Sequence, residues 1–187
     1  MATDPHQRLT IAEYLAFERQ SETRHDYLDG EVFAMTGASW THGLISGNIF
    51  GELRSQLKGS SCRAIQESLR VRTPADLFTY PDVVVVCGKP RFDDSAQDTV
   101  LNPTLVVEVL SPTTETYDRK TKARQYRSIP SLSDYVLVAQ NQVRVEQWSR
   151  HGDDWLQKEL TSLEHLLDMP AIGCKLLLSD VYELVFE

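Results

Sequence analysis

The chain has 187 residues, a formal net charge of −8 at pH 7, 41% hydrophobic residues and 25% charged residues. This length suits one core, so we expect residues 1–187 to form a single domain. The acidic balance disfavours a protein that coats nucleic acid indiscriminately, although it leaves room for a local nucleic-acid site. No run approaches the length of a membrane span, and the N-terminus lacks the features of a signal peptide. We therefore expect a cytoplasmic protein that does not enter a membrane.

The N-terminal third predicts two helices and a hairpin. The stretch TIAEYLAFE from Thr10 begins with a capping box and continues with helical spacing. In HDYLDGEVFAM, Asp29-Gly30 stands between apolar arms, which indicates a β-hairpin. A longer helix should begin after Ser39 as N-cap and stop at Gly59. Its apolar residues recur at helical intervals: Leu44, Ile45, Ile49, Leu53 and Leu57.

The rest of the chain is rich in strands. YPDVVVVC (80–87) and TLVVEVL (104–110) are the most apolar segments and predict buried strands, with a polar loop at 88–102 between them. RKTKARQYR (119–127) predicts a short helix. DYVLVAQ and RVEQWSR predict a second hairpin, WLQKEL a further strand, and LSDVYELVF a short closing helix. We therefore predict an α+β fold, in which a mostly antiparallel or mixed sheet carries the longest helix on one face.

The cysteines and tryptophans are scattered. Cys62, Cys87 and Cys174 are far apart and odd in number, so we interpret them as small apolar residues and not as a disulfide framework or a zinc site. The tryptophans are not interleaved with basic residues, so we predict that they pack in or beside the core and do not stack on bases. They are Trp40, Trp148 and Trp155.

Each of the two most apolar strands carries one carboxylate. Asp82 stands at the start of the first strand and Glu108 toward the end of the second. If the strands pair antiparallel, the two side chains meet on one face, with Cβ atoms about 4.5–7 Å apart. Close carboxylates repel unless a proton or a cation lies between them, and hard oxygen ligands suit Mg²⁺ or Mn²⁺. The alternative is that Asp82 is a solvated cap and Glu108 faces water.

The segment 119–127 is strongly basic. On a helix, Arg119, Lys122 and Tyr126 share one face, which the loop after Glu108 can fold back over the strand ends. An ammonium there would orient a metal-bound water or stabilise charge on a phosphate. The alternative is a solvated basic face.

These residues together resemble the PD-(D/E)XK nuclease superfamily, and in particular its Uma-type branch of restriction-like endonucleases. The matching pieces are DYLDGEVFAMTGAS-x-x-H, YPDVVVVC, PTLVVEVLSPTTETYDRKTK-x-x-x-Y and IPSLSDYVLV. The resemblance implies a restriction-endonuclease-like fold, with a central mixed β-sheet flanked by helices and extra β-hairpins. It also implies a divalent metal, Mg²⁺ or Mn²⁺, and hydrolysis of phosphodiester bonds in DNA.

Carried over by position, Asp82 and Glu108 would be the metal carboxylates, and the Val109 backbone carbonyl a further ligand. The chain departs from the superfamily where a lysine is usual, because Leu110 stands two residues after the glutamate. In the Uma-type branch this lysine lies in the following helix, and Lys122 occupies that place. A flexible four-carbon stem makes such a shift physically reasonable.

Further residues match family positions or suit the substrate. His42, in the first turn of the long helix, would position a water or a phosphate as part of the catalytic set, and Glu31 would add an acidic group. Their ordinary interpretations are a half-exposed histidine and a hairpin surface residue. The basic side chains expected to meet the DNA backbone are Arg119, Lys120 and Arg124. Because such nucleases often cut two strands as dimers, we expect a homodimer.

Two other functions fit the same residues. The fold can serve as a nucleic-acid or protein-binding module whose chemistry is weak or lost. Alternatively, Asp82 and Glu108 can act as the acid and the base or nucleophile of a glycoside hydrolase, which would need no metal and would use an aromatic sugar cleft. Dependence on a divalent metal and the effect of Asp82→Ala and Lys122→Ala distinguish the three.

Overall fold

A six-stranded mixed sheet forms the centre of the molecule in the computed structural model, which describes residues 8–35 and 37–186. The strands follow the spatial order β11-β10-β9-β8-β6-β3. Only β8 and β9 pair parallel, and the other neighbours are antiparallel. Their bounds are β3 Cys62–Gln66, β6 Val83–Cys87, β8 Leu105–Leu110, β9 Asp134–Ala139, β10 Val145–His151 and β11 Asp154–Leu160. This mixed α+β architecture confirms the predicted fold class.

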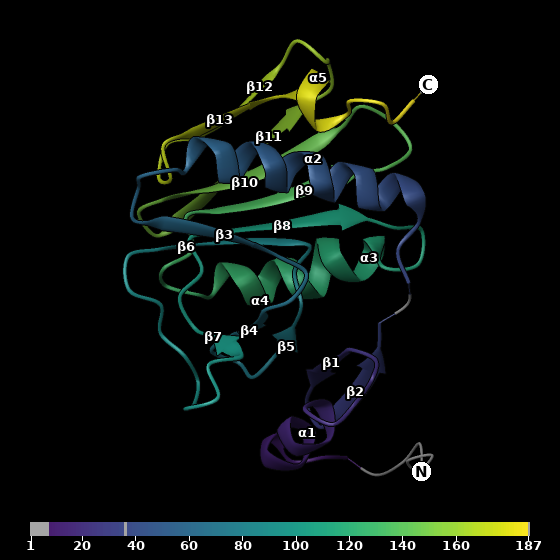
Figure 1. The fold of residues 1–187 in the computed structure, drawn as a ribbon, viewed down its shortest axis with the longest axis vertical. Helices are drawn as coiled ribbons and strands as arrows, with labels where there is room; N and C mark the ends of the chain where they lie inside the picture. The colour runs from purple at the N-terminus through teal and green to yellow at the C-terminus, as the bar shows by residue number, and fades with distance from the viewer. Residues whose placement is uncertain (1–7, 36, 187) are drawn as a thin grey trace.

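The helix α2 (Trp40–Gln56) covers one face of this sheet (Figure 1). It begins where predicted, because the Ser39 hydroxyl accepts a hydrogen bond from the His42 backbone N–H at 3.1 Å. Its apolar stripe, with Ile49 and Leu53 at its centre, is fully buried against the sheet. The sheet residues of this core belong to alternate positions of the central strands: Val83, Val85, Val107, Val109, Val136 and Val138.

The opposite face is covered by the connection from β8 to β9 (Figure 1). A parallel pair of strands requires such a crossover. The connection consists of α3 (Glu115–Tyr117), the π-helix η1 (Asp118–Lys122) and α4 (Ala123–Arg127). The second core lies between this connection and the sheet, and Tyr126 and Tyr135 are completely buried in it.

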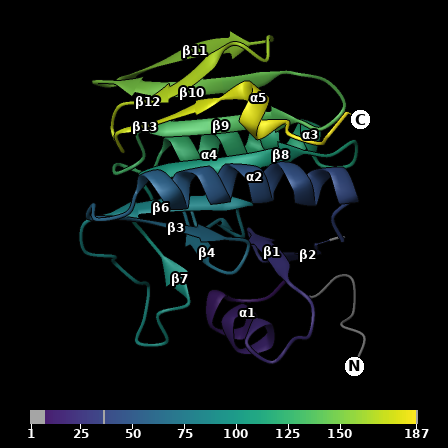
Figure 2. The ribbon, with the colours of Figure 1, turned by 45° about the horizontal axis from the view of Figure 1, so that its top comes forward.

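A smaller sheet lies beyond the crossover, next to the helix α1 (Ile11–Glu18) (Figure 2). The predicted capping box of α1 and the predicted hairpin are both present, the hairpin turning at Asp29 and Gly30 with positive φ angles of 51° and 88°. The sheet order is β2-β1-β5-β4-β7. The bounds are β1 His25–Leu28, β2 Glu31–Ala34, β4 Arg70–Arg72, β5 Phe78–Thr79 and β7 Thr99–Val100.

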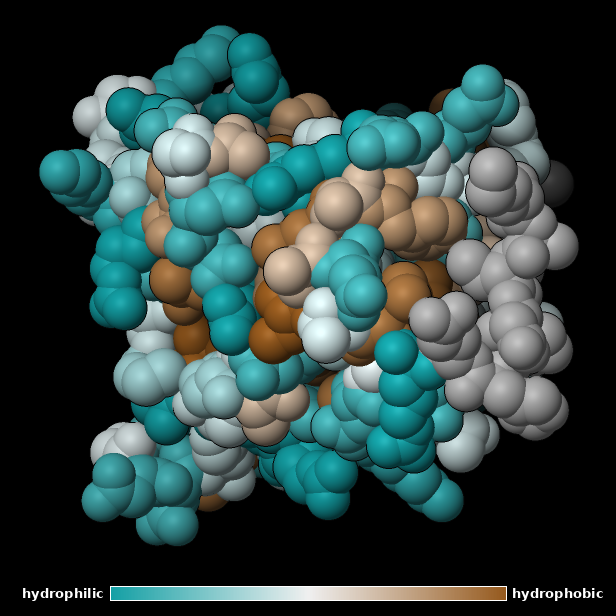
Figure 3. Space-filling view, turned by 90° about the horizontal axis from the view of Figure 1, so that it is seen from below, coloured by the Kyte–Doolittle hydropathy of each residue, from teal (hydrophilic) through white to brown (hydrophobic). Residues whose placement is uncertain are grey.

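The face that carries α1 is seen from below in Figure 3, with hydrophobic residues near its centre and hydrophilic residues around its margin. Two side chains at the end of the β1–β2 hairpin, Phe33 and Met35, are exposed. At the other end of the molecule the chain closes with β12 (Leu166–Met169), β13 (Cys174–Leu177) and α5 (Leu178–Val181). None of the helices in the described part of the chain has both the length and the apolar character of a membrane span.

Two predictions from scattered residues were wrong. Cys62 and Cys87 face each other in the β3–β6 register and form a disulfide, while Cys174 is buried and free. Distance along the chain says nothing about which strands become neighbours, so the sequence alone could not pair them. Trp40 is 82% exposed at the start of α2 and belongs to no core. The other two tryptophans are half-buried, as predicted.

Candidate active site

Asp82 and Glu108 lie at the end of the sheet where β6 begins. Because Val83 pairs with Val107 in the antiparallel β6–β8 ladder, the next position along each strand brings Asp82 opposite Glu108. Both side chains are buried, at 8% and 4% exposure. The backbone N–H of Val109 donates to Asp82 Oδ2 at 2.6 Å, which ties the aspartate to the strand of the glutamate.

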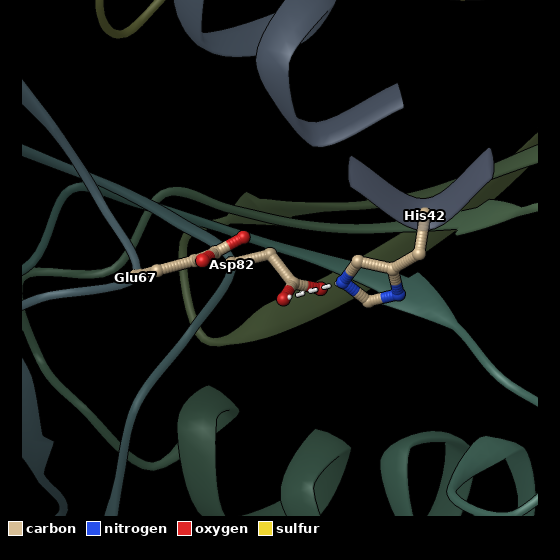
Figure 4. Close-up of side chains that lie close together, drawn as sticks. All are labelled: His42, Glu67 and Asp82. Atoms are coloured by element: carbon tan, nitrogen blue, oxygen red, sulfur yellow. Dashed lines mark hydrogen bonds and ion pairs between the residues drawn. The ribbon is translucent and has the colours of Figure 1, made fainter. Parts of the chain in front are cut away.

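His42 and Glu67 complete a group of ligand atoms around Asp82 (Figure 4). His42 Nε2 lies 2.9 Å from Asp82 Oδ1, and one ligand atom from each of the three residues lies within 4.8 Å of the others. The N-cap at Ser39 places His42 in the first turn of α2, at the helix end that reaches Asp82. Glu67 follows β3, and its backbone N–H donates to the Asp82 carbonyl at 3.1 Å.

Lys122 lies on the other side of Glu108. Its ammonium is 3.1 Å from Glu108 Oε1, 3.4 Å from Asp118 Oδ1 and 3.7 Å from Asp26 Oδ2. The Tyr126 hydroxyl donates to the same Glu108 oxygen at 2.8 Å. The π-helix η1 runs from Asp118 to Lys122, and its wider turn sets both side chains toward the sheet. One amine is thus held by three buried carboxylates.

Burial and crowded negative charge shift the protonation equilibria of this cluster. Burial, followed by the charges of Asp118 and Asp82, raises the pKa of Glu108 to about 8 against the opposing effect of Lys122. Burial alone would lower the pKa of Lys122, but Glu108, Asp26 and Asp118 together raise it well above its ordinary value. The Lys122 amine therefore stays protonated, whereas Glu108 loses its proton only at a higher pH than an ordinary glutamate.

His42 responds to two opposing effects. Burial lowers the pKa of its imidazole, but the hydrogen bond to Asp82 and the charge of that carboxylate outweigh burial and raise it. A cation at His42 is therefore favourable in the electrostatic field of this site.

Several polar atoms around Lys122 are buried without a hydrogen-bond partner among the described residues. They include Asp26 Oδ1 and Asp118 Oδ1, the latter near the ammonium but accepting no hydrogen bond from it, and the Tyr117 hydroxyl. The Tyr117 ring centre lies 6.0 Å from Lys122 Nζ. Buried carboxylate oxygens that accept no hydrogen bond cost free energy, so the cluster suits a further cation or ordered water.

All of these residues lie within the part of the chain that matches a known family. The model of the Uma2 family, described as "Putative restriction endonuclease", matches residues 11–179. The chain belongs to the Uma2 family. The resemblance drawn from the sequence is therefore confirmed.

Two proteins of Synechocystis sp. are relatives of this Uma2 protein. "Uncharacterized protein slr1290" is 34% identical over 180 residues, covering 95% of this chain and 93% of the relative. "Uncharacterized protein sll1609" is 34% identical over 154 residues, covering 81% and 87%. A crystal structure from Anabaena variabilis, described as a putative nuclease belonging to DUF820, superposes with a TM-score of 0.76. It shares 18% identity over 93% of this chain and 97% of that chain, and so it shows the common fold.

The structure brings four predicted residues of this Uma2 protein into one site: His42, Asp82, Glu108 and Lys122. Val109 lies there too, through its backbone N–H on Asp82.

The other predicted residues lie outside this cluster. Glu31 is exposed in the β1–β2 hairpin, where its Oε1 lies 3.8 Å from a guanidinium nitrogen of Arg8. Arg119 is paired with Glu115 and Glu146, whereas Lys120 and Arg124 are exposed on the crossover.

Three acidic residues of the site did not emerge from the sequence. Asp118 had a local signal, because it stands one helical turn before Lys122. Asp26, in the hairpin, and Glu67, in the polar end of β3, had none, since only the tertiary fold brings them near.

Proposed function

We propose that this Uma2 protein is a metal-dependent DNA endonuclease that hydrolyses phosphodiester bonds. The observation that carries the proposal is the pair of buried carboxylates, Asp82 and Glu108, on adjacent central strands, with the Lys122 ammonium 3.1 Å from the glutamate. Membership of a family described as restriction endonucleases supports the same function.

The residues fit a divalent metal. Asp82 and Glu108 supply hard carboxylate oxygens, which Mg²⁺ and Mn²⁺ prefer. Glu108 Oε1 is engaged by Lys122 and Tyr126, while Oε2 accepts no hydrogen bond from a described residue and is free to bind an ion. The surplus of acidic groups over basic ones in the cluster also favours a cation.

Each side chain then has a distinct task. Asp82 and Glu108, with the Val109 carbonyl as a further ligand, would hold the metal. A bound divalent ion lowers the pKa of water and polarises a phosphoryl oxygen. Lys122 remains protonated and stabilises the negative charge that develops on the phosphate. His42 holds Asp82 in place and orients the attacking water.

DNA contacts would come from the crossover. Lys120 and Arg124 are exposed and available to phosphates, which predicts salt-sensitive binding. Arg119 would have to leave Glu115 and Glu146 to join them. We further propose a homodimer, which light scattering on the purified protein will test.

The decisive experiment is nicking of supercoiled plasmid with Mg²⁺ or Mn²⁺, comparing wild type with Asp82→Ala and Lys122→Ala. We expect a loss of at least about 100-fold for each variant, as removal of one charge-stabilising group typically causes. The matched control is Lys158→Ala, which removes an exposed amine on the edge strand β11 and should retain full activity.

Equal residual cleavage in all preparations would indicate contamination and would exclude this active site. In that case, salt-sensitive binding of DNA by wild type without cleavage would favour the alternative, a nuclease fold that acts as a binding module. Activity on a glycoside that survives chelation would favour the hydrolase alternative instead.

A further inference from the structure

The group His42, Glu67 and Asp82 differs in chemistry from the Asp82–Glu108 pair. It contains an imidazole nitrogen among its ligand atoms, and these atoms come from three separate elements, α2, the end of β3 and the start of β6. Imidazole suits first-row transition ions, whereas Mg²⁺ takes oxygen ligands and keeps much of its water. The presence of His42 among the ligand atoms therefore favours a first-row transition ion over Mg²⁺ at this group.

We infer that His42 and Glu67 join Asp82 as direct ligands, so that the site selects a first-row transition ion over Mg²⁺. This inference rests on the proposed function in that it concerns the ion of the same site. With the ion bound, His42 exchanges its hydrogen bond to Asp82 for a bond to the metal, so this ligand role replaces the water-orienting role given to it above. The inference also gives a ligand role to Glu67, to which the proposed function assigns none.

The distances suit a single small ion. Two ligands at right angles on an octahedral ion with bonds of about 2.1 Å lie about 3.0 Å apart. His42 Nε2 and Asp82 Oδ1 are 2.9 Å apart. An ion between them would take the place of the proton that now joins the two atoms. A carboxylate oxygen of Glu67 lies within 4.8 Å of both atoms, and rotation of the glutamate side chain can bring it into bonding distance of the same ion.

Hydrogen bonds behind the ligands hold them in this arrangement. Asp82 Oδ2 is occupied by the Val109 N–H, which leaves Oδ1 toward His42. The Ser46 hydroxyl lies 3.3 Å from Glu67 Oε1, and Gln66 donates to Ser46 at 3.1 Å. Such outer contacts orient metal ligands, and their loss typically weakens metal binding by about 10–100-fold.

The backbone of Glu67 is also fixed. Its φ angle of 49° is in the left-handed region, which is uncommon for a residue with a side chain. The Arg24 guanidinium donates to its carbonyl, and its own N–H donates to the Asp82 carbonyl. These bonds stabilise a conformation that directs the glutamate toward Asp82 and His42.

The test measures ion binding to the whole protein without nucleic acid. Titration calorimetry with Mg²⁺, Mn²⁺ and Co²⁺ should give affinities that rise in that order, with Co²⁺ at least about ten-fold tighter than Mg²⁺. His42→Ala should weaken Co²⁺ by at least about ten-fold while changing Mg²⁺ by less than about three-fold. Glu67→Gln should weaken both ions. The matched controls are His151→Ala, which removes an exposed histidine, and Glu52→Gln on α2.

A spectroscopic measurement on wild type keeps the inference testable if His42→Ala fails to fold. Bound Co²⁺ shifts the ring N–H proton of a ligating histidine far outside the usual proton range. We expect this signal in wild type and in His151→Ala and its absence in His42→Ala. Equal affinities for Mg²⁺ and Co²⁺, or the lack of a shifted ring signal in wild type, would overturn the inference.

The two proposals fail separately. If Co²⁺ binds through His42 but no metal supports nicking of plasmid, the ligand assignment stands and the nuclease proposal does not. If Mg²⁺ supports nicking while His42→Ala leaves Co²⁺ binding unchanged, the nuclease proposal stands and the ligand assignment is wrong.

Discussion

At the scale of single residues, Glu108 occupies a position that disfavours its own negative charge. It is 4% exposed, lies beside Asp82 and Asp118, and depends on Lys122 and Tyr126 for compensation. A carboxylate whose environment opposes its charge is typical of functional sites, because core positions without a task are filled by apolar residues. The valines on either side of it show what that strand otherwise requires.

This position should make stability depend on pH in the metal-free protein. The pKa of Glu108 rises from 4.5 to about 8, so the folded state holds a proton that the unfolded state has lost between these values. Its contribution is complete below about pH 4.5 and is lost as the pH rises through 8. We expect Glu108→Gln to gain stability relative to wild type between pH 5 and pH 8, measured by urea unfolding. If the difference in the free energy of unfolding between Glu108→Gln and wild type stays the same from pH 5 to pH 8, the pKa of Glu108 is not raised.

At the scale of elements, the start of α2 controls the site. Ser39 caps the helix through the His42 N–H and also donates to Gln140 at 2.7 Å. The cap fixes the start of the helix, and His42 in its first turn then lies next to Asp82.

Ser39→Ala should lower the free energy of unfolding by about 1 kcal/mol, the usual cost of a lost N-cap. Urea unfolding will measure this, with Ser55→Ala in the exposed last turn of α2 as the control. If both substitutions cost the same, the cap has no special role. The variant should also weaken Co²⁺ binding, since the first turn frays around His42.

Elements with strong local signals were predictable from sequence, and elements held by distant contacts were not. The capping box at Thr10, the Asp29-Gly30 turn and the cap at Ser39 each use neighbours in the chain, and all three are present. The short strands β4, β5 and β7 have two or three residues each and exist only because they pair with one another and with β1. The π-helix likewise carries no pattern that distinguishes it from an α-helix.

The candidate site divides in the same way. Asp82 and Glu108 stand out because a carboxylate in an apolar strand is conspicuous by itself. Glu67 and Asp26 stand in ordinary polar surroundings in the sequence. Their approach to the site depends on the β3–β6 pairing and on the packing of the small sheet beneath η1.

At the scale of the whole molecule, a network of ion pairs joins α1 to the small sheet. Arg19, just after α1, pairs with Asp98 at 2.8 Å and with Asp94 at 2.6 Å. Asp98 also pairs with Arg70, whose side chain is 2% exposed. A buried guanidinium needs its partner, so Asp98 matters more than its own partial exposure suggests.

Lowering the pH should weaken the ion pairs that Asp98 forms with Arg19 and Arg70. The pKa of Asp98 is lowered most by the hydrogen bond from Arg19. The hydrogen bond and the charge of Arg70 lower it further, and together they outweigh the opposing effect of partial burial. Its contribution to stability is therefore present above about pH 4 and is lost as the pH falls toward the depressed value. We expect Asp98→Asn to be clearly less stable than wild type at pH 7, and we expect this difference to shrink as the pH falls from 4 to 2, with Asp153→Asn in an exposed turn as the control. A difference of the same size at pH 7 and at pH 2 would show that charge is not the cause.

Because Lys122 belongs to the crossover and not to a strand, the proposed active site can be altered in a particular way. Leu110, at the place where a lysine is usual, is 4% exposed and belongs to the apolar core. Strand β8 therefore carries no charged side chain besides Glu108. The ammonium belongs instead to the crossover, whose length and helical pitch can change without moving the strands that hold the two carboxylates. Lengthening or shortening 111–117 would retune the reach of Lys122 while the strands that anchor Asp82 and Glu108 stay as they are.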